Sequence, residues 1–158
     1  MPEKFHPNAV KVAEALRALN APGEIVVLPD SAPTAEAAAA QLGCEIGAIA
    51  NSLIFNADGA PLLVLTSGAH RVNTALIART IGAESVRRAT PEFVREATGQ
   101  PIGGVAPVGH PAPVRTLVDR WLGKYDAVWA AGGHPHTVFQ TSFDELVRIT
   151  GGMPVNVE

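Results

Sequence analysis

The chain carries a single cysteine, Cys44, among its 158 residues. One thiol cannot form an internal disulfide or a multi-cysteine metal cluster, and this agrees with a reducing compartment. No apolar run approaches the roughly 20 residues of a membrane span, and the N-terminal residues Met1–His6 have no secretory apolar region. We therefore expect a cytoplasmic protein without a membrane partner, in which Cys44 is a small hydrophobic side chain rather than a nucleophile.

The sequence also has no excess of basic charge, because its formal net charge is −3. Proteins that bind duplex DNA by charge usually present a basic surface, so duplex DNA is not an expected partner. Hydrophobic residues make up 47% and charged residues 17%, a balance that excludes disorder. Residues 1–158 are long enough for one globular domain with a substantial core. Local basic stretches at 71–88 and 115–124 leave room for a restricted contact with nucleic acid.

Most familiar catalytic motifs are absent. The chain has no P-loop, no dinucleotide fingerprint, no G-x-S-x-G elbow and no HExxH. Ser52, Ser67 and Ser85 stand in ordinary strand or turn contexts. His134-Pro135-His136 has an H-x-H spacing, but the proline limits how the two rings can converge on one ion. We expect no metal and no cofactor.

The sequence alternates helix and strand signals from end to end. Val10 to Leu19 has helical spacing, and Thr34, Asn73, Thr90 and Ser142 are helix caps followed by stops at Gly43, Gly82, Gly99 and Gly151. Strand signals cover residues 24–28, 51–55, 61–65, 85–88, 114–118, 127–131 and 137–140. Asp58-Gly59 predicts an antiparallel hairpin, which argues against a purely parallel sheet. The expected fold is α/β (α+β), with a mixed sheet surrounded by helices.

Two loops combine glycine with histidine beside predicted strands. The segment Gly103–Pro111 holds three glycines and two prolines within a short stretch that also contains two valines. Glycine allows a ligand to approach the backbone amides and proline fixes the loop shape, so such a segment can present donors to a carbonyl or anionic oxygen. The second loop is Gly132–His136. If the loops converge, they form a pocket.

Structural explanations of the same residues stay open. Gly103–Pro111 is equally typical of a rigid turn. His134 either contacts a substrate or is a turn residue that binds a backbone carbonyl, and the same two interpretations apply to His110 and His136.

Several segments together resemble the YbaK/prolyl-tRNA synthetase-associated domain family of trans-editing enzymes. These segments are Ile46 to Phe55 with the Asp58-Gly59 hairpin, Ala89 to Gly99, Gly103 to Gly109 and Val128 to Gly133. Their order and spacing cover nearly the whole chain. The resemblance implies a compact fold with a strongly curved mixed sheet, and hydrolysis of mischarged aminoacyl-tRNA without a metal.

The resemblance also implies which residues form the site. The implied catalytic residues are Gly103, Gly104, Val105, Ala106 and His134, where the loop amides stabilise an oxyanion and His134 positions the substrate. The implied substrate-binding residues are Asn51, Pro107, Gly109, His110, Gly132 and Gly133. The implied ligand is the 3'-terminal aminoacyl-adenosine of a mischarged tRNA carrying a small amino acid. The tRNA for proline and an aminoacyl-tRNA synthetase are the expected partners.

Asn51 departs from the pattern of the family, in which many members carry lysine at this position. Asparagine is neutral and lacks the long cationic reach of lysine toward the terminal phosphate of tRNA. The change predicts altered aminoacyl specificity, weaker tRNA binding or loss of activity. A noncatalytic module that binds tRNA or a small ligand is therefore the alternative function, and an esterase for small molecules is a third.

Overall fold

The helices begin and end close to the predicted caps. The computed structural model describes residues 6–32 and 34–158. Its α-helices are α1 (Pro7–Ala18), α2 (Ala35–Leu42), α3 (Thr74–Ile81), α4 (Pro91–Thr98) and α5 (Phe143–Thr150), and two 3-10 helices are η1 (Ile46–Ala48) and η2 (Arg120–Lys124).

Each of the four predicted caps accepts a hydrogen bond from a backbone amide in the first helical turn, and each predicted glycine stop has a left-handed conformation. Val12 and Leu16 of the predicted face of α1 are buried, together with Ala9, whereas Val10 and Leu19 are only partly buried.

The strands form one mixed sheet, as the sequence predicts. They are β1 (Ile25–Val27), β2 (Ile49–Ala57), β3 (Ala60–Ser67), β4 (Val86–Arg88), β5 (Arg115–Asp119), β6 (Val128–Ala131), β7 (Thr137–Thr141) and β8 (Met153–Val155). The order is β1-β7-β6-β2-β3-β5-β8, with β4 added to β2. The Asp58-Gly59 hairpin joins β2 to β3 in antiparallel register. Strand β8, which contains Pro154, was not predicted; it pairs in parallel with β5.

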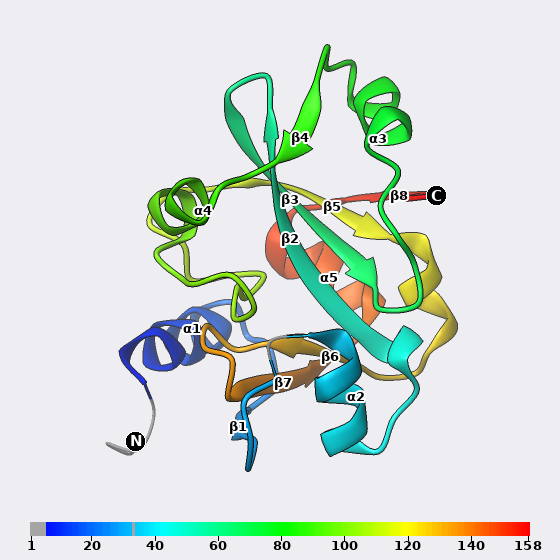
Figure 1. Cartoon of the computed structure of the whole chain (residues 1–158). Coiled ribbons are helices and arrows are strands. Elements are labelled where there is room, and N and C mark those ends of the chain that lie inside the picture. The colour runs from blue at the N-terminus through cyan, green and yellow to red at the C-terminus, as the bar shows by residue number, and fades with distance from the viewer. Residues whose placement is uncertain (1–5, 33) are drawn as a thin grey trace.

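Strand β2 has two different neighbours on one of its edges. Ile49 and Ala50 pair in parallel with β6, whereas Phe55, Asn56 and Ala57 pair with β4. Over residues 51–54, which are all described, no strand pairs with this edge. Figure 1 shows β4 and β6 leaving β2 toward opposite ends of the molecule, with the loop after α4 lying between them. The sheet is therefore open at the middle of β2.

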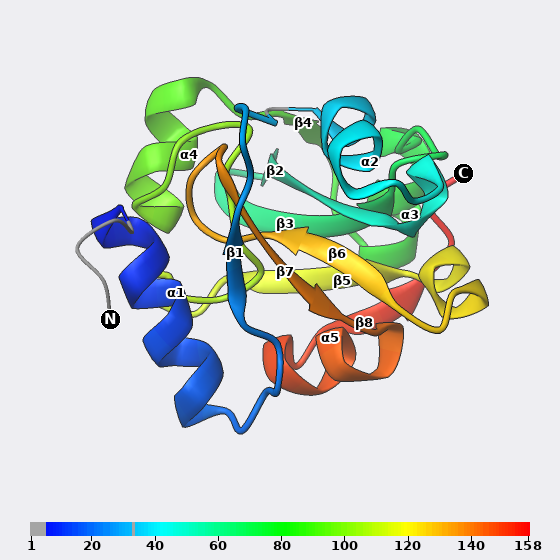
Figure 2. The ribbon, with the colours of Figure 1, turned by 90° about the horizontal axis from the view of Figure 1, so that it is seen from below.

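The hydrophobic core occupies both faces of the central strands. Leu63 and Leu65 of β3 pack with residues of α1, α4 and α5, whereas Leu62 and Val64 pack with Ile77 of α3. This alternation follows the two-residue period of a strand, and it explains why the sequence of β3 is an almost continuous hydrophobic run. In Figure 2, α1 and α4 lie toward one end of the sheet, while α2 and α3 lie toward the other.

A buried carboxylate joins the end of β3 to η2. Asp119 is 1% exposed. Its Oδ2 atom accepts from the Ser67 amide at 2.9 Å and lies 2.8 Å from Nδ1 of His70, and its Oδ1 atom accepts from the Trp121 amide at 2.9 Å. The hydroxyl of Thr66 also donates to Oδ2. The carboxylate thus satisfies polar groups from three segments.

In the described part of the chain, no helix is long and apolar enough to cross a membrane.

We predict that Asp119→Ala lowers the free energy of unfolding by about 3 kcal/mol, because it leaves the buried donors of Ser67 and Trp121 without an acceptor. Urea denaturation measures this change. Asp126→Ala, at an exposed aspartate, is the control and should change the free energy of unfolding by less than about 0.5 kcal/mol. Equal effects of the two substitutions would contradict a structural role for Asp119.

Candidate functional site

The open edge of β2 forms the wall of a cleft made of two adjoining cavities. The inner cavity lies toward β6 and has a volume of about 30 Å³. The outer cavity lies toward β4 and has a volume of about 250 Å³. Six residues line both cavities and mark their junction: Thr34, Ala35, Asn51, Ser52, Gly103 and Val105. We call this whole feature the β2 cleft.

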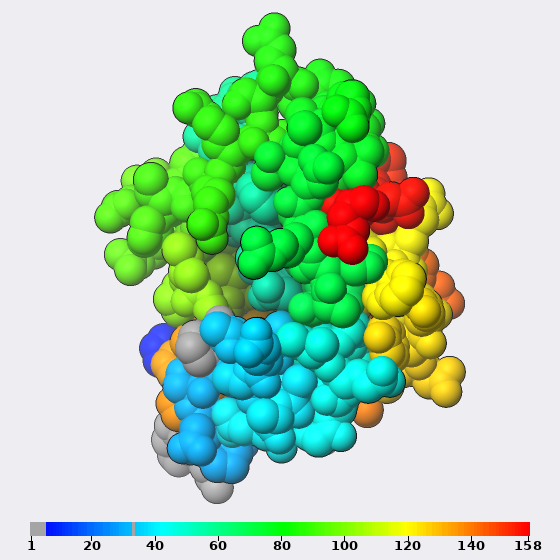
Figure 3. Space-filling model, turned by 45° about the vertical axis from the view of Figure 1, so that its right-hand side comes forward, coloured from blue at the N-terminus to red at the C-terminus, as the bar shows by residue number. Residues whose placement is uncertain are grey.

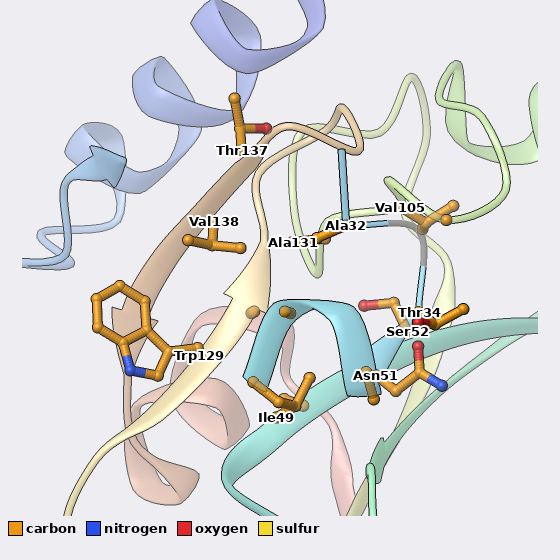
Figure 4. A pocket seen from close by; sticks show the side chains of 15 residues that line it. Ala32, Thr34, Ile49, Asn51, Ser52, Val105, Trp129, Ala131, Thr137 and Val138 are labelled. Carbon is orange, nitrogen blue, oxygen red and sulfur yellow. The ribbon is translucent and has the colours of Figure 1, made fainter. Parts of the chain in front are cut away.

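The inner cavity is small and mainly apolar. Ala35 and Ala38 of α2 form one side, and Ala131 and Trp129 of β6 form another. Figure 4 shows Thr34, Asn51, Ser52 and Val105 gathered at one end, with Trp129 and Val138 at the other. The cavity therefore fits a small group that enters from the junction.

The outer cavity is wider and carries the charge of the cleft. Its lining includes Leu53 to Phe55 of β2, Ala89, Val94 and Ile102. Arg88 contributes the one ionisable side chain among the lining residues that the structure describes. In Figure 3 the teal atoms of β2 lie recessed between the atoms of α2 below and those of the α3–α4 region above.

The loop that follows α4 is held by a buried side chain. Gln100 is 2% exposed, and its Oε1 atom accepts from the amide of Ala106 at 2.7 Å. The amide of Gly104 donates to the carbonyl of Pro101 at 3.0 Å. Within the described residues, the amides of Gly103 and Val105 have no hydrogen-bond acceptor, and both residues line the β2 cleft. Of the four predicted oxyanion donors, these two remain available.

The two glycine loops converge. A Cβ atom built on Gly104 would lie 2.8 Å from the Cα and carbonyl carbon of His134 and 2.9 Å from Cδ of Pro135. Real Cβ atoms do not approach so closely, so only glycine permits this contact. The need for glycine at 104 thus comes from loop packing, whereas the sequence interpretation assigned it to the approach of a ligand.

His134 lies outside the lining of the β2 cleft. Its ring stacks on His6 at 4.6 Å and on His136 at 5.6 Å between centroids, and its Nδ1 atom accepts from the amide of His136. Desolvation lowers the pKa of His134, and the two neighbouring histidines lower it further. A neutral imidazole accepts the amide hydrogen bond, so in this conformation His134 acts as a turn residue.

The other predicted residues shape the loops. His110 Nε2 lies 2.8 Å from the carbonyl of Ala106, and burial lowers the pKa of this imidazole. Pro107 is buried. Gly109 and Gly133 have positive φ and approach Val12 of α1 closely. Gly132 is buried and lies against Thr137. None of them lines the two cavities.

Ser52 is a polar residue of the cleft that the sequence did not mark as a candidate site residue. Its Oγ atom is buried and has no hydrogen-bond partner among the described residues, although it lies at the junction of the cleft. Buried hydroxyls are normally paired, because an unpaired one costs about 1–3 kcal/mol. A bound molecule with a polar atom at the junction would satisfy it. No sequence signal marks Ser52, since whether its buried hydroxyl is paired depends on residues that are far away in the chain.

Cys44 has the surroundings expected of a small hydrophobic side chain. It is half-buried and packs against the cluster that contains Leu28, Ala38 and Ile49. Burial raises the pKa of its thiol, which favours the uncharged form. Within residues 6–32 and 34–158, no group of three or more His, Cys, Asp and Glu side chains is arranged to hold a metal ion.

Comparison with known proteins identifies the family. The family model for the aminoacyl-tRNA editing domain matches residues 29–149, so the chain belongs to the aminoacyl-tRNA editing domain family. A crystal structure whose description names a candidate trans-editing enzyme for prolyl tRNA synthetase has a TM-score of 0.90 and 39% identity, over 98% of this chain and 99% of that one. The predicted fold and family are therefore confirmed.

The curated relatives differ in the share of their own length that the chain matches. A proline–tRNA ligase from Nitratidesulfovibrio vulgaris (strain Hildenborough) is 37% identical over 103 residues, which are 65% of this chain but 18% of the ligase. An uncharacterised protein, YwhH of Bacillus subtilis (strain 168), is 28% identical over 128 residues, or 80% of this chain and 81% of that protein. The chain thus corresponds to one part of the ligase.

We predict that Gly104→Ala separates the two glycine loops and lowers the free energy of unfolding by about 1–3 kcal/mol, as overpacking typically does. Urea denaturation checks this value. Gly123→Ala is the matched control, since its Cβ atom would meet Phe143 at an ordinary 3.5 Å. A Gly104→Ala protein as stable as the control would show that the loops need no close contact.

Proposed function

We propose that the chain hydrolyses the ester of a mischarged tRNA that carries a small amino acid. The observation that carries the proposal is the β2 cleft, in which a small apolar cavity meets a larger cavity at a junction of unpaired polar groups. The family to which the chain belongs supports the same reading. The aminoacyl side chain would occupy the inner cavity, and the terminal adenosine would occupy the outer one.

The chemistry needs little from the side chains. An aminoacyl ester is activated, and a water molecule that attacks its carbonyl carbon gives a tetrahedral oxyanion. Collapse breaks the bond to the ribose oxygen, which takes a proton, and releases the free amino acid. The amides of Gly103 and Val105 are the candidate donors to the oxyanion, and one preorganised donor contributes about 10²- to 10³-fold to the rate.

Of the described residues that line the cleft, none is a histidine, an acid or a cysteine. A side-chain general base is therefore not part of the proposal. Ser52 would bind a polar group of the substrate or the attacking water, and Asn51 would donate or accept a hydrogen bond at the same junction. The substrate's own amino or ribose hydroxyl groups would assist in activating the water.

The inner cavity would select the amino acid by size. Its volume of about 30 Å³ and its alanine walls fit a methyl or hydroxymethyl group. A larger side chain would collide with Trp129 and Ile49 of the lining, and steric rejection of a larger group is strong in a packed site. Alanyl and seryl esters are thus the proposed substrates. The tRNA for proline, acting with its synthetase, is the proposed partner, in view of the similarity to part of a proline–tRNA ligase.

The proposal is tested by deacylation of purified tRNAs charged with alanine, serine, threonine and proline, with Asn51→Lys measured at the same concentration. We expect the wild-type protein to release alanine or serine selectively. Absence of release from every tRNA would contradict the proposal. In that case, activity of Asn51→Lys alone would favour a degenerate binding module, for which the neutral Asn51 at the junction is the supporting observation.

We predict that Ser52→Ala lowers kcat/KM at least about tenfold while the free energy of unfolding stays equal or rises, because the substitution removes an unpaired buried hydroxyl. Thr141→Val is the matched control. Thr141 carries the second unpaired buried hydroxyl among the described residues, and it lines neither cavity. Single-turnover deacylation and urea denaturation measure both variants. Full activity of Ser52→Ala would remove Ser52 from the site.

A further inference from the structure

We infer that Arg88 binds the phosphate on the 5' side of the terminal adenosine. The inference rests on the proposed function and adds to it the group that recognises the polynucleotide. Arg88 is the last residue of β4 and is exposed. Among the described residues that line the β2 cleft it is the one charged side chain, and none of them is a carboxylate. A neutral cleft with one cation at its outer end favours an anionic group there.

The register of the sheet fixes the position of this cation. Arg88 pairs with Phe55, and Ser52 lies three residues earlier on β2. Since a strand rises about 3.3 Å per residue, the junction and the Arg88 rung are about 10 Å apart along β2. Leu53 and Ile54 lie between them on β2, and Ile102 also lines the outer cavity. This apolar stretch accommodates a nucleoside, with its ester at Ser52 and its phosphate at Arg88.

The guanidinium of Arg88 is available for this role. Within the described residues, it takes part in no ion pair. Arginine presents a planar array of donors that matches phosphate geometry. Asn51, at the junction, is uncharged and cannot supply a cation. The family pattern would place the phosphate ligand on β2, whereas this chain offers a cation on the adjoining strand β4.

The neighbouring Arg87 provides a matched control. Both arginines are exposed and lie on the same strand, so they contribute equally to the net charge. Successive side chains of a strand point to opposite faces, and Arg87 does not line the cleft. A general effect of charge on tRNA binding would therefore appear in both variants, whereas a specific phosphate contact would appear in Arg88→Ala alone.

The experiment measures binding of two non-hydrolysable probes by fluorescence anisotropy. The first is a labelled cytidine-cytidine-adenosine trinucleotide with alanine attached to its 3' end through an amide. The second is the labelled alanyl-amide adenosine nucleoside, which has no phosphate. Arg88→Ala should weaken trinucleotide binding at least about tenfold, as loss of a charge-assisted contact does. Its log–log salt slope should be smaller by about 0.7, the value for one phosphate of a single strand. Nucleoside binding should stay unchanged, and Arg88→Lys should recover part of the affinity.

Three results would overturn the inference: equal losses in Arg87→Ala and Arg88→Ala, an equal loss for the nucleoside probe, or no binding of the trinucleotide to the wild-type protein. Failure of the proposed function looks different. If the trinucleotide binds through Arg88 but no charged tRNA is deacylated, the phosphate contact holds and the hydrolytic proposal fails. If deacylation proceeds equally well in Arg88→Ala and the wild-type protein, the hydrolytic proposal holds and the Arg88 contact fails.

Discussion

The sharing of one edge of β2 between two diverging strands is the constraint on which the site depends. A strand edge can pair with only one neighbour at each position, and β6 and β4 occupy its two ends. The polar backbone between them, at residues 51–54, therefore faces a space rather than a strand. Side chains of α2, β6 and the loop after α4 enclose this space, and the β2 cleft results.

Two kinds of contact hold the cleft open and in shape. Gln100 satisfies the amide of Ala106 and fixes the loop from within, while the absence of a side chain at Gly104 lets the loop rest on His134 and Pro135. Gly103 and Val105 then lie at the junction with their amides unpaired in the described structure. The residues that shape the loop and the residues that face the cleft thus alternate along the chain.

This division explains why the site residues were only partly predictable. Gly104, His110 and Gly133 have the composition of a binding loop, but the structure uses them for packing. Ser52 has no sequence signal because the absence of a partner for its buried hydroxyl depends on residues far apart in the chain. In the sequence, Arg88 looks like an ordinary surface charge. In the structure, β4 pairs with β2, so that Arg88 lies opposite Phe55 and lines the cleft. Sequence patterns indicate that a loop can bind a ligand through its backbone amides. Which of those amides are free to do so depends on the acceptors that lie near them in the folded structure.

The sequence by itself determined the helices, the central hairpin, the mixed sheet and the family. Caps such as Thr34 and Ser142, stops such as Gly43, and the Asp58-Gly59 turn act within a few residues, so they can be read locally. Only the tertiary structure decided the order of the strands, the pairing of β8 with β5, the convergence of the loops and the open edge of β2. These features join residues far apart in the chain, and packing of the whole core selects them.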